Sequence, residues 1–107
     1  MQWLETYRLT VFVPEDTLEE FIKVVGPKIP SFLGTYDHVC WWSEPGTEQS
    51  REKEDGEIER ISCVKFECSL PKDQSLLERF INETVRPAHP WKEPVILIQE
   101  QQIMKTK

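Results

Sequence analysis

Two side chains with metal-binding chemistry, His38 and Cys40, stand two positions apart in the sequence. Residues at i and i+2 share one face of a β-strand, and an imidazole with a thiolate suits copper or zinc. The pair supplies only half of a tetrahedral site. The remaining ligands would have to come from another subunit or from this chain's Glu44, Cys63, His89 or Glu93. A divalent or cuprous ion is therefore one candidate ligand, and structural packing of both side chains is the alternative.

A second group of candidate residues lies in a proline-rich corner that begins at His89. Pro90 and Pro94 fix the backbone around Trp91, which could anchor a contact, and Glu93, which could accept backbone N–H bonds. His89 could bind a ligand or hydrogen-bond a neighbouring carbonyl group. Because aromatic residues are favoured as interface anchors, the ligand-binding or interface residues that we predict are Tyr36, Trp42, His89, Trp91 and Glu93.

We find no pattern that predicts catalysis. The four glycines form no phosphate-binding loop, and the spacing of the two histidines places neither beside a serine or a cysteine as a general base. Cys40 and His38 stand at i and i+2, and neighbours at this spacing rarely have the geometry of a nucleophile and its general base. We therefore expect a protein that is not an enzyme.

The composition narrows the class of protein. A chain of 107 residues suits one domain, residues 1–107, and its net charge of −6 makes nucleic acid an unfavourable partner. Its apolar runs are far shorter than the roughly 20 residues that span a bilayer. The first residues carry no secretory leader pattern, so we expect a cytoplasmic protein. The odd number of cysteines, three, without C-x-x-C spacing, predicts free thiols.

The first half of the chain predicts a strand, a helix and a strand. Residues 3–13 alternate in part between apolar and polar side chains, as a half-buried strand does. Asp16 and Glu19 form a capping-box-like start for a helix of about three turns that ends near Val25. The segment 35–44 is rich in aromatic and β-branched residues and predicts a second strand. One face of that strand would carry Tyr36, His38, Cys40 and Trp42.

The second half predicts a strand, a helix and a strand again. Residues 44–60 contain seven acidic and three basic residues and are typical of a solvated hairpin connection. Alternation resumes over 57–70, with Val64, Phe66, Cys68 and Leu70 on one side. A helix opens at Pro71 and Asp73, and a last strand runs over 95–103.

These elements predict an α+β fold, a ferredoxin-like βαββαβ sandwich with a four-stranded antiparallel sheet and two helices on one face. The last strand begins with four consecutive apolar residues, 95–98, so we expect both of its faces to be buried. Two layers can cover only one face of a sheet. We expect this strand to be central in the sheet, where leaving each Leu or Ile side chain exposed to water would forfeit about 1.5–3 kcal/mol. We therefore expect the open sheet face to pack against another copy.

Three segments in order and spacing resemble one known domain type. They are 7–15 (YRLTVFVPE), 33–37 (LGTYD) and 88–94 (AHPWKEP). The chain resembles, over about residues 5–99, the CutA-like, PII-like domain inserted in the hexameric dinuclear-metal-centre proteins of the NGG-one-interacting-factor-three family and also found alone. Cys40 comes one residue later after Tyr36 than the family pattern has it, the hairpin loop is shorter, and Trp91 replaces the usual Tyr.

The resemblance implies a ferredoxin-like fold and an oligomeric binding or regulatory module, with a trimer favoured. Its small ligand or protein partner would bind in clefts between subunits. The alternative that we keep is a metal-ion binding or tolerance protein using His38 and Cys40. The dinuclear metal ligands of the large family members belong to another domain, so the resemblance carries no such centre to this chain.

Overall fold

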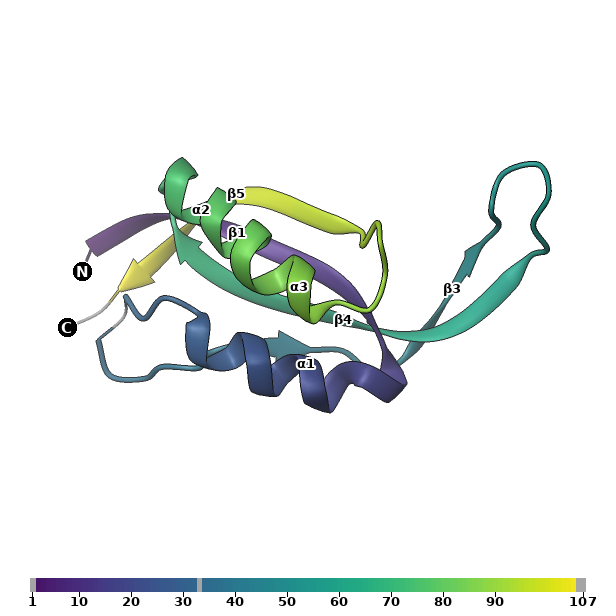
Figure 1. Cartoon of the computed structure of the whole chain (residues 1–107). Helices are drawn as coiled ribbons and strands as arrows, with labels where there is room; N and C mark the ends of the chain where they lie inside the picture. The colour runs from purple at the N-terminus through teal and green to yellow at the C-terminus, as the bar shows by residue number, and fades with distance from the viewer. Residues whose placement is uncertain (1, 33, 106–107) are drawn as a thin grey trace.

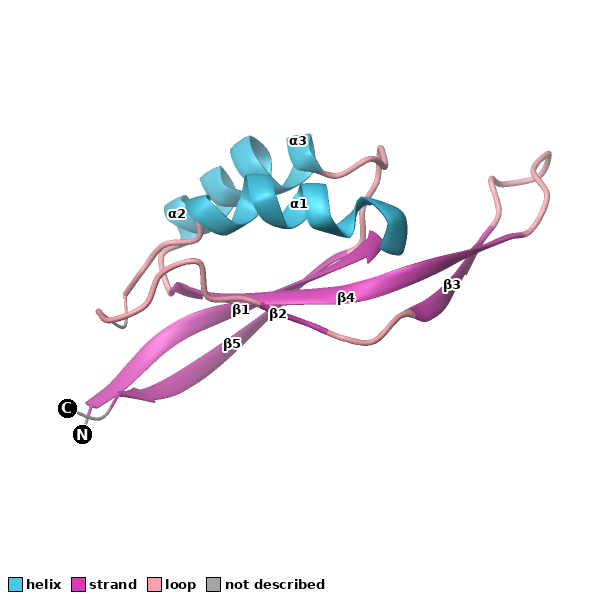
Figure 2. Ribbon diagram, turned by 90° about the horizontal axis from the view of Figure 1, so that it is seen from below, coloured by secondary structure: helices cyan, strands magenta, loops and turns pink. Residues whose placement is uncertain are grey.

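A five-stranded antiparallel sheet carries the helices on one face and leaves the other face open (Figures 1 and 2). The computed structural model describes residues 2–32 and 34–105. The strands are β1 (Gln2–Pro14), β2 (Trp41–Trp42), β3 (Gly46–Ser50), β4 (Glu59–Pro71) and β5 (Ile96–Lys105). The helices are α1 (Leu18–Val25), α2 (Gln74–Phe80) and α3 (Arg86–Ala88), with 3₁₀ turns η1 (Glu15–Thr17) and η2 (Gly26–Lys28) and a π-helical turn η3 (Ile81–Val85).

The sheet has the strand order of a ferredoxin-like fold. The order is β2-β4-β1-β5, and β3 pairs with the beginning of β4. Within the ladder, Leu9 lies opposite Cys68 of β4 on one side and Ile98 of β5 on the other. The predicted α+β fold with both helical segments on one face is therefore confirmed, while the expected four strands become five because the acidic connection contains β3.

The core lies between the sheet and the helices. Leu9, Val11 and Val13 of β1 face it and have no exposed surface, as the sequence alternation predicts. The T-shaped contact of Phe21 in α1 and Phe66 in β4, with ring centroids 5.1 Å apart, joins the two layers. The other buried members include Val25, Val64, Cys68, Leu70, Leu77, Phe80 and Val85. Burying each large side chain contributes about 1.5–3 kcal/mol.

The predicted second strand, 35–44, is wrong over most of its length. Only Trp41 and Trp42 pair with β4, and the residues before them form a loop. His38 has a φ of 58°, and Gly34 has a φ of 96°. A left-handed residue breaks the extended backbone that a strand requires. Residues 36, 38, 40 and 42 therefore do not share one strand face.

The predicted solvated connection is a projecting hairpin arm. β3 runs alongside the first residues of β4, with Gly46 opposite Cys63 and Ser50 opposite Glu59. The arm extends beyond the helices, and the molecule measures 54 × 24 × 21 Å (Figure 2). Its polar side chains face water on both sides, so the acidic residues remain solvated as expected.

The structure confirms the predicted helix cap at Asp73 and contradicts the one predicted at Asp16. The Asp73 carboxylate accepts the amide of Leu76 over 3.1 Å at the start of α2. Asp16 lies in η1, and α1 begins after Thr17 with no side-chain cap. No helix among residues 2–32 and 34–105 combines the length and the apolar character that crossing a membrane would need.

Candidate functional site

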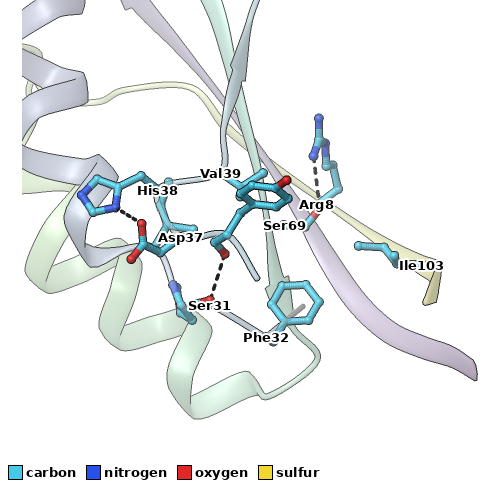
Figure 3. Close-up of a pocket in the computed structure, with 11 residues that line it drawn as sticks. Arg8, Ser31, Phe32, Asp37, His38, Val39, Ser69 and Ile103 are labelled. Atoms are coloured by element: carbon cyan, nitrogen blue, oxygen red, sulfur yellow. Dashed lines mark hydrogen bonds and ion pairs between the residues drawn. The ribbon is translucent and has the colours of Figure 1, made fainter. Parts of the chain in front are cut away.

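A cavity of about 170 Å³ lies where the loop after α1 meets the sheet (Figure 3). The loop contributes its aromatic and polar walls, and three strands contribute one side chain each. Tyr36 is the most exposed of the wall residues that the sequence singled out, with 74% of its surface accessible. The residues that line the cavity are Arg8, Ile29, Pro30, Ser31, Phe32, Tyr36, Asp37, His38, Val39, Ser69 and Ile103.

Several polar groups of this cavity are already paired. The Arg8 guanidinium donates to the Ser69 hydroxyl over 3.1 Å and lies 3.5 Å from the Glu67 carboxylate. Ser31 donates to the Tyr36 carbonyl over 3.0 Å, which holds the loop in its turn. A pocket with mostly apolar walls and a few fixed polar groups suits a small apolar or aromatic ligand with a polar edge.

His38 stands at the far side of the cavity from Arg8 in Figure 3. Its Nδ1 lies 2.7 Å from the Asp37 carboxylate, and both side chains are exposed. The ring passes over the end of α1, since an added Cβ on Gly26 would lie 3.7 Å from His38 Cδ2. His38 therefore contacts a carboxylate and the helix end rather than a thiol.

Cys40 does not complete a metal site with His38. It packs partly buried against the core, behind the loop, and does not line the cavity. Burial raises the pKa of its thiol, which disfavours the thiolate that a metal needs. Among the described residues no three His, Cys, Asp or Glu side chains gather closely enough to hold an ion. Metal binding through these two residues would need donors from a second copy.

His89 is a structural residue of the proline-rich corner. It is 6% exposed, and both of its ring nitrogens are engaged. Nδ1 accepts the amide of Trp91 over 3.1 Å, so Nε2 carries the proton and donates to the Phe12 carbonyl over 2.7 Å. Burial lowers the pKa of His89 below its ordinary value of 6.5, and the Phe12 carbonyl opposes that shift. The neutral ring thus supports Trp91, whose ring centroid lies 5.2 Å away.

Trp91 and Glu93 face a hollow beside the hairpin arm. Glu48 of β3 and Glu59 of β4 line the same hollow, together with Ser50 and Ile61. Trp42 lines a different hollow, beside Leu18, Glu44 and Val64. The predicted residues therefore divide among three places on the surface, and the cavity at Tyr36 lies at the opposite end of β4 from the hollow at Trp91.

The open sheet face combines paired charges with exposed apolar side chains. Glu67 accepts the Thr10 hydroxyl over 2.7 Å and pairs with Arg8 in the middle of the face. Leu97 of β5 lies opposite Thr10, points to this face and is 49% exposed. Ile98 points to the helix side but remains 38% exposed. β5 is the edge strand rather than a central one, so its apolar run is uncovered both on the open face and along a free edge.

The sequence did not single out Arg8 or Phe32 as cavity residues. Arg8 carried a usable signal, because it lies at a polar position of an alternating strand whose other face is fully buried. A charged side chain there has to lie on the open face of the sheet. The contribution of Phe32 depends on the path of the loop, which no spacing in the sequence defines.

No protein-family model and no curated protein sequence matches this chain. Solved structures do. A Bacillus cereus protein related to NIF3 superposes with a TM-score of 0.76 at 29% identity, over 94% of this chain and 27% of that one. CutA1 from Oryza sativa gives a TM-score of 0.62 at 13% identity, over 97% of this chain and 84% of that one. A Bacillus subtilis GlnK–ATP complex gives 0.55 at 12% identity, over 91% and 82%.

These similarities define the fold. The chain has a CutA/PII-like fold, as the sequence resemblance implies. It spans about a quarter of the length of the NIF3-related protein.

Proposed function

We propose that this chain is a non-enzymatic, homo-oligomeric binding or regulatory module of the CutA/PII-like type. Copies pack through the open sheet face, and a small ligand or a protein partner binds in the clefts between them. The trimer is the form that the family resemblance favours. The observation that carries the proposal is the exposed apolar side chain of Leu97, which lies on the open face of the edge strand β5.

The central charges of the open face are paired with each other. Arg8 lies 3.5 Å from Glu67 and donates to Ser69, and Glu67 accepts the Thr10 hydroxyl. A covering protomer would therefore not bury this pair as isolated charges, whereas Lys65, which lies on the same face opposite Phe12, would need a partner in the covering copy. Burying Leu97 instead removes apolar surface from water, at about 25 cal/mol per Å².

The cavity at Tyr36 borders the same face. Arg8 and Ile103 belong to the open face by register, since Ile103 lies opposite Leu4 and Arg8 opposite Ser69. A second copy on this face would close the neighbouring side of the cavity. Tyr36 therefore stands where a ligand could contact two subunits, and Trp91 with Glu93 offers a corresponding place at the other end. We place the module in the cytoplasm, as the three free thiols of the structure favour.

Size-exclusion chromatography with light scattering at micromolar concentration tests the assembly. We expect a mass of about three times the 12.7 kDa protomer. Leu97→Glu should dissociate the assembly. Val24→Glu is the matched control, because Val24 is 44% exposed on α1, in the helix layer. A monomeric wild-type protein, or equal behaviour of the two variants, would contradict the proposal.

A further inference from the structure

Cys40 directly precedes the strand β2, and Cys68 lies on the neighbouring strand β4. In the β2–β4 ladder Trp41 is opposite Glu67 and Trp42 is opposite Phe66. The same register continued by one residue sets Cys40 opposite Cys68. Directly opposed residues point to the same face of a sheet. Cys68 belongs to the core cluster, and Cys40 packs against that cluster.

The position of this pair in the ladder suits a covalent link. The Ser43 amide donates to the Lys65 carbonyl over 3.0 Å, which makes these two a hydrogen-bonded pair. Hydrogen-bonded and non-hydrogen-bonded pairs alternate, so Cys40 and Cys68 fall at a non-hydrogen-bonded position. Cα atoms of such pairs are about 4.5 Å apart, and disulfides bridge Cα separations of about 4.4–6.8 Å.

We propose that Cys40 and Cys68 form an intramolecular disulfide site that is oxidised by a low-molecular-weight disulfide. This assignment does not depend on the oligomeric state, because both side chains lie on the helix side of the sheet. Cys63 cannot take part, since it lies opposite Pro14 and Gly46, on the other face.

The two cysteines have different roles in the reaction. Cys40 is partly exposed, so its thiolate attacks one sulfur of the external disulfide RSSR and releases one thiolate RS⁻, leaving a mixed disulfide. Cys68 has no exposed surface, and burial is the main cause that raises its pKa to about 12. It therefore acts second: its sulfur attacks the Cys40 sulfur and displaces the second RS⁻, which takes up the Cys68 proton. The two protein thiols are oxidised, and RSSR is reduced to two RSH.

The bond would restrain the loop that forms the Tyr36 cavity. β2 contains only two residues, Trp41–Trp42, and begins directly after Cys40, so the end of the loop is held to the sheet by a short ladder. A covalent link to β4 would fasten the end of this loop. Oxidation would then slow cleavage of the loop by chymotrypsin, whose sites include Phe32 and Tyr36.

The test uses the full chain in its native state. The protein is incubated with oxidised glutathione, quenched with acid, alkylated in denaturant and digested with trypsin. Trypsin separates the three cysteines, because Lys65 lies between Cys63 and Cys68. Cys40 falls in peptide 29–51, Cys63 in 61–65 and Cys68 in 66–72. We expect 29–51 linked to 66–72, a mass loss of about 2 Da and a monomer band on a non-reducing gel.

Three variants complete the experiment. Cys63→Ser should keep the link, Cys40→Ser should abolish it, and Cys68→Ala should leave Cys40 as a mixed disulfide with glutathione. If Cys68→Ala does not fold, the wild-type digest and Cys40→Ser decide the outcome. A wild-type protein that keeps an alkylated Cys68 beside a glutathionylated Cys40, or that links peptide 61–65, would overturn the proposal.

Discussion

The imidazole of His89 joins two parts of the chain that are 77 residues apart, since its Nε2 lies 2.7 Å from the carbonyl oxygen of Phe12. The second ring nitrogen accepts the amide of Trp91. The corner that precedes β5 is therefore tied to the end of β1 through one buried, neutral ring. This relationship determines how Trp91 and Glu93 are presented to the hollow beside the hairpin arm.

Removal of this ring should destabilise the fold. His89→Ala leaves the Phe12 carbonyl and the Trp91 amide without their partner, and we expect a loss of about 2–3 kcal/mol in the free energy of unfolding. Urea denaturation followed by tryptophan fluorescence measures it. His38→Ala is the control, because His38 is exposed and contacts Asp37, so its effect should stay within about 0.5 kcal/mol. Equal losses in both variants would show that the ring is not a structural tie.

The same ring should make stability depend on pH. Burial lowers the pKa of His89 in the folded state below the ordinary value of 6.5, so the unfolded chain binds the proton more readily. The contribution is fully present above about pH 6.5 and is lost as the pH falls through the folded pKa. We expect the urea midpoint of the wild type to decline as the pH falls below about 6.5. His89→Gln should flatten this decline, and an unchanged slope would count against the assignment.

The sequence predicts the strands and helices that bury one face, because burial imposes a periodic pattern of apolar residues. It does not predict elements that lack such a pattern. Apolar Leu9, Val11 and Val13 occupy every second position of β1 because their face of the strand is buried. The sequence therefore predicts which side of the sheet faces the core. β3 (Gly46–Ser50) has no such pattern, since its side chains face water and only pairing with β4 makes it a strand. For the segment before Trp41 the sequence predicts a strand that the structure does not contain. Its β-forming residues are held in a loop by the Ser31–Tyr36 hydrogen bond and by the left-handed backbone of His38.

The sequence singles out two of the residues that line the cavity and does not predict how the candidate residues group in space. Tyr36 and His38 do line one cavity, but Trp91 and Glu93 lie elsewhere because the loop after α1 and the corner before β5 meet opposite ends of the sheet. The partner of His89 could not be found from spacing, since Phe12 is far away in sequence. The opposition of Cys40 and Cys68 likewise depends on strand register.

The two helix starts provide a matched pair of substitutions. Asp73 accepts the Leu76 amide at the start of α2, and Asp73→Ala should cost about 1 kcal/mol of stability. Asp16→Ala should change it by less than about 0.5 kcal/mol, since the Asp16 side chain caps no helix. Thermal and urea unfolding of both variants measure the difference. A larger loss for Asp16→Ala would mean that α1 begins earlier than the structure has it.

The three thiols should react in a fixed order in the reduced protein. Cys40 is partly exposed, whereas Cys63 and Cys68 are buried, so iodoacetamide should label Cys40 at least about tenfold faster than either. Burial raises the pKa of the Cys40 thiol above 9.0, so its labelling rate should rise about tenfold per pH unit from pH 7 to 9 without a plateau. Cys68, whose pKa is raised to about 12, should be labelled only as the chain unfolds. Timed quenching and tryptic mapping resolve the three sites. A Cys40 rate that levels off below pH 9 would mean that its thiolate is stabilised rather than desolvated.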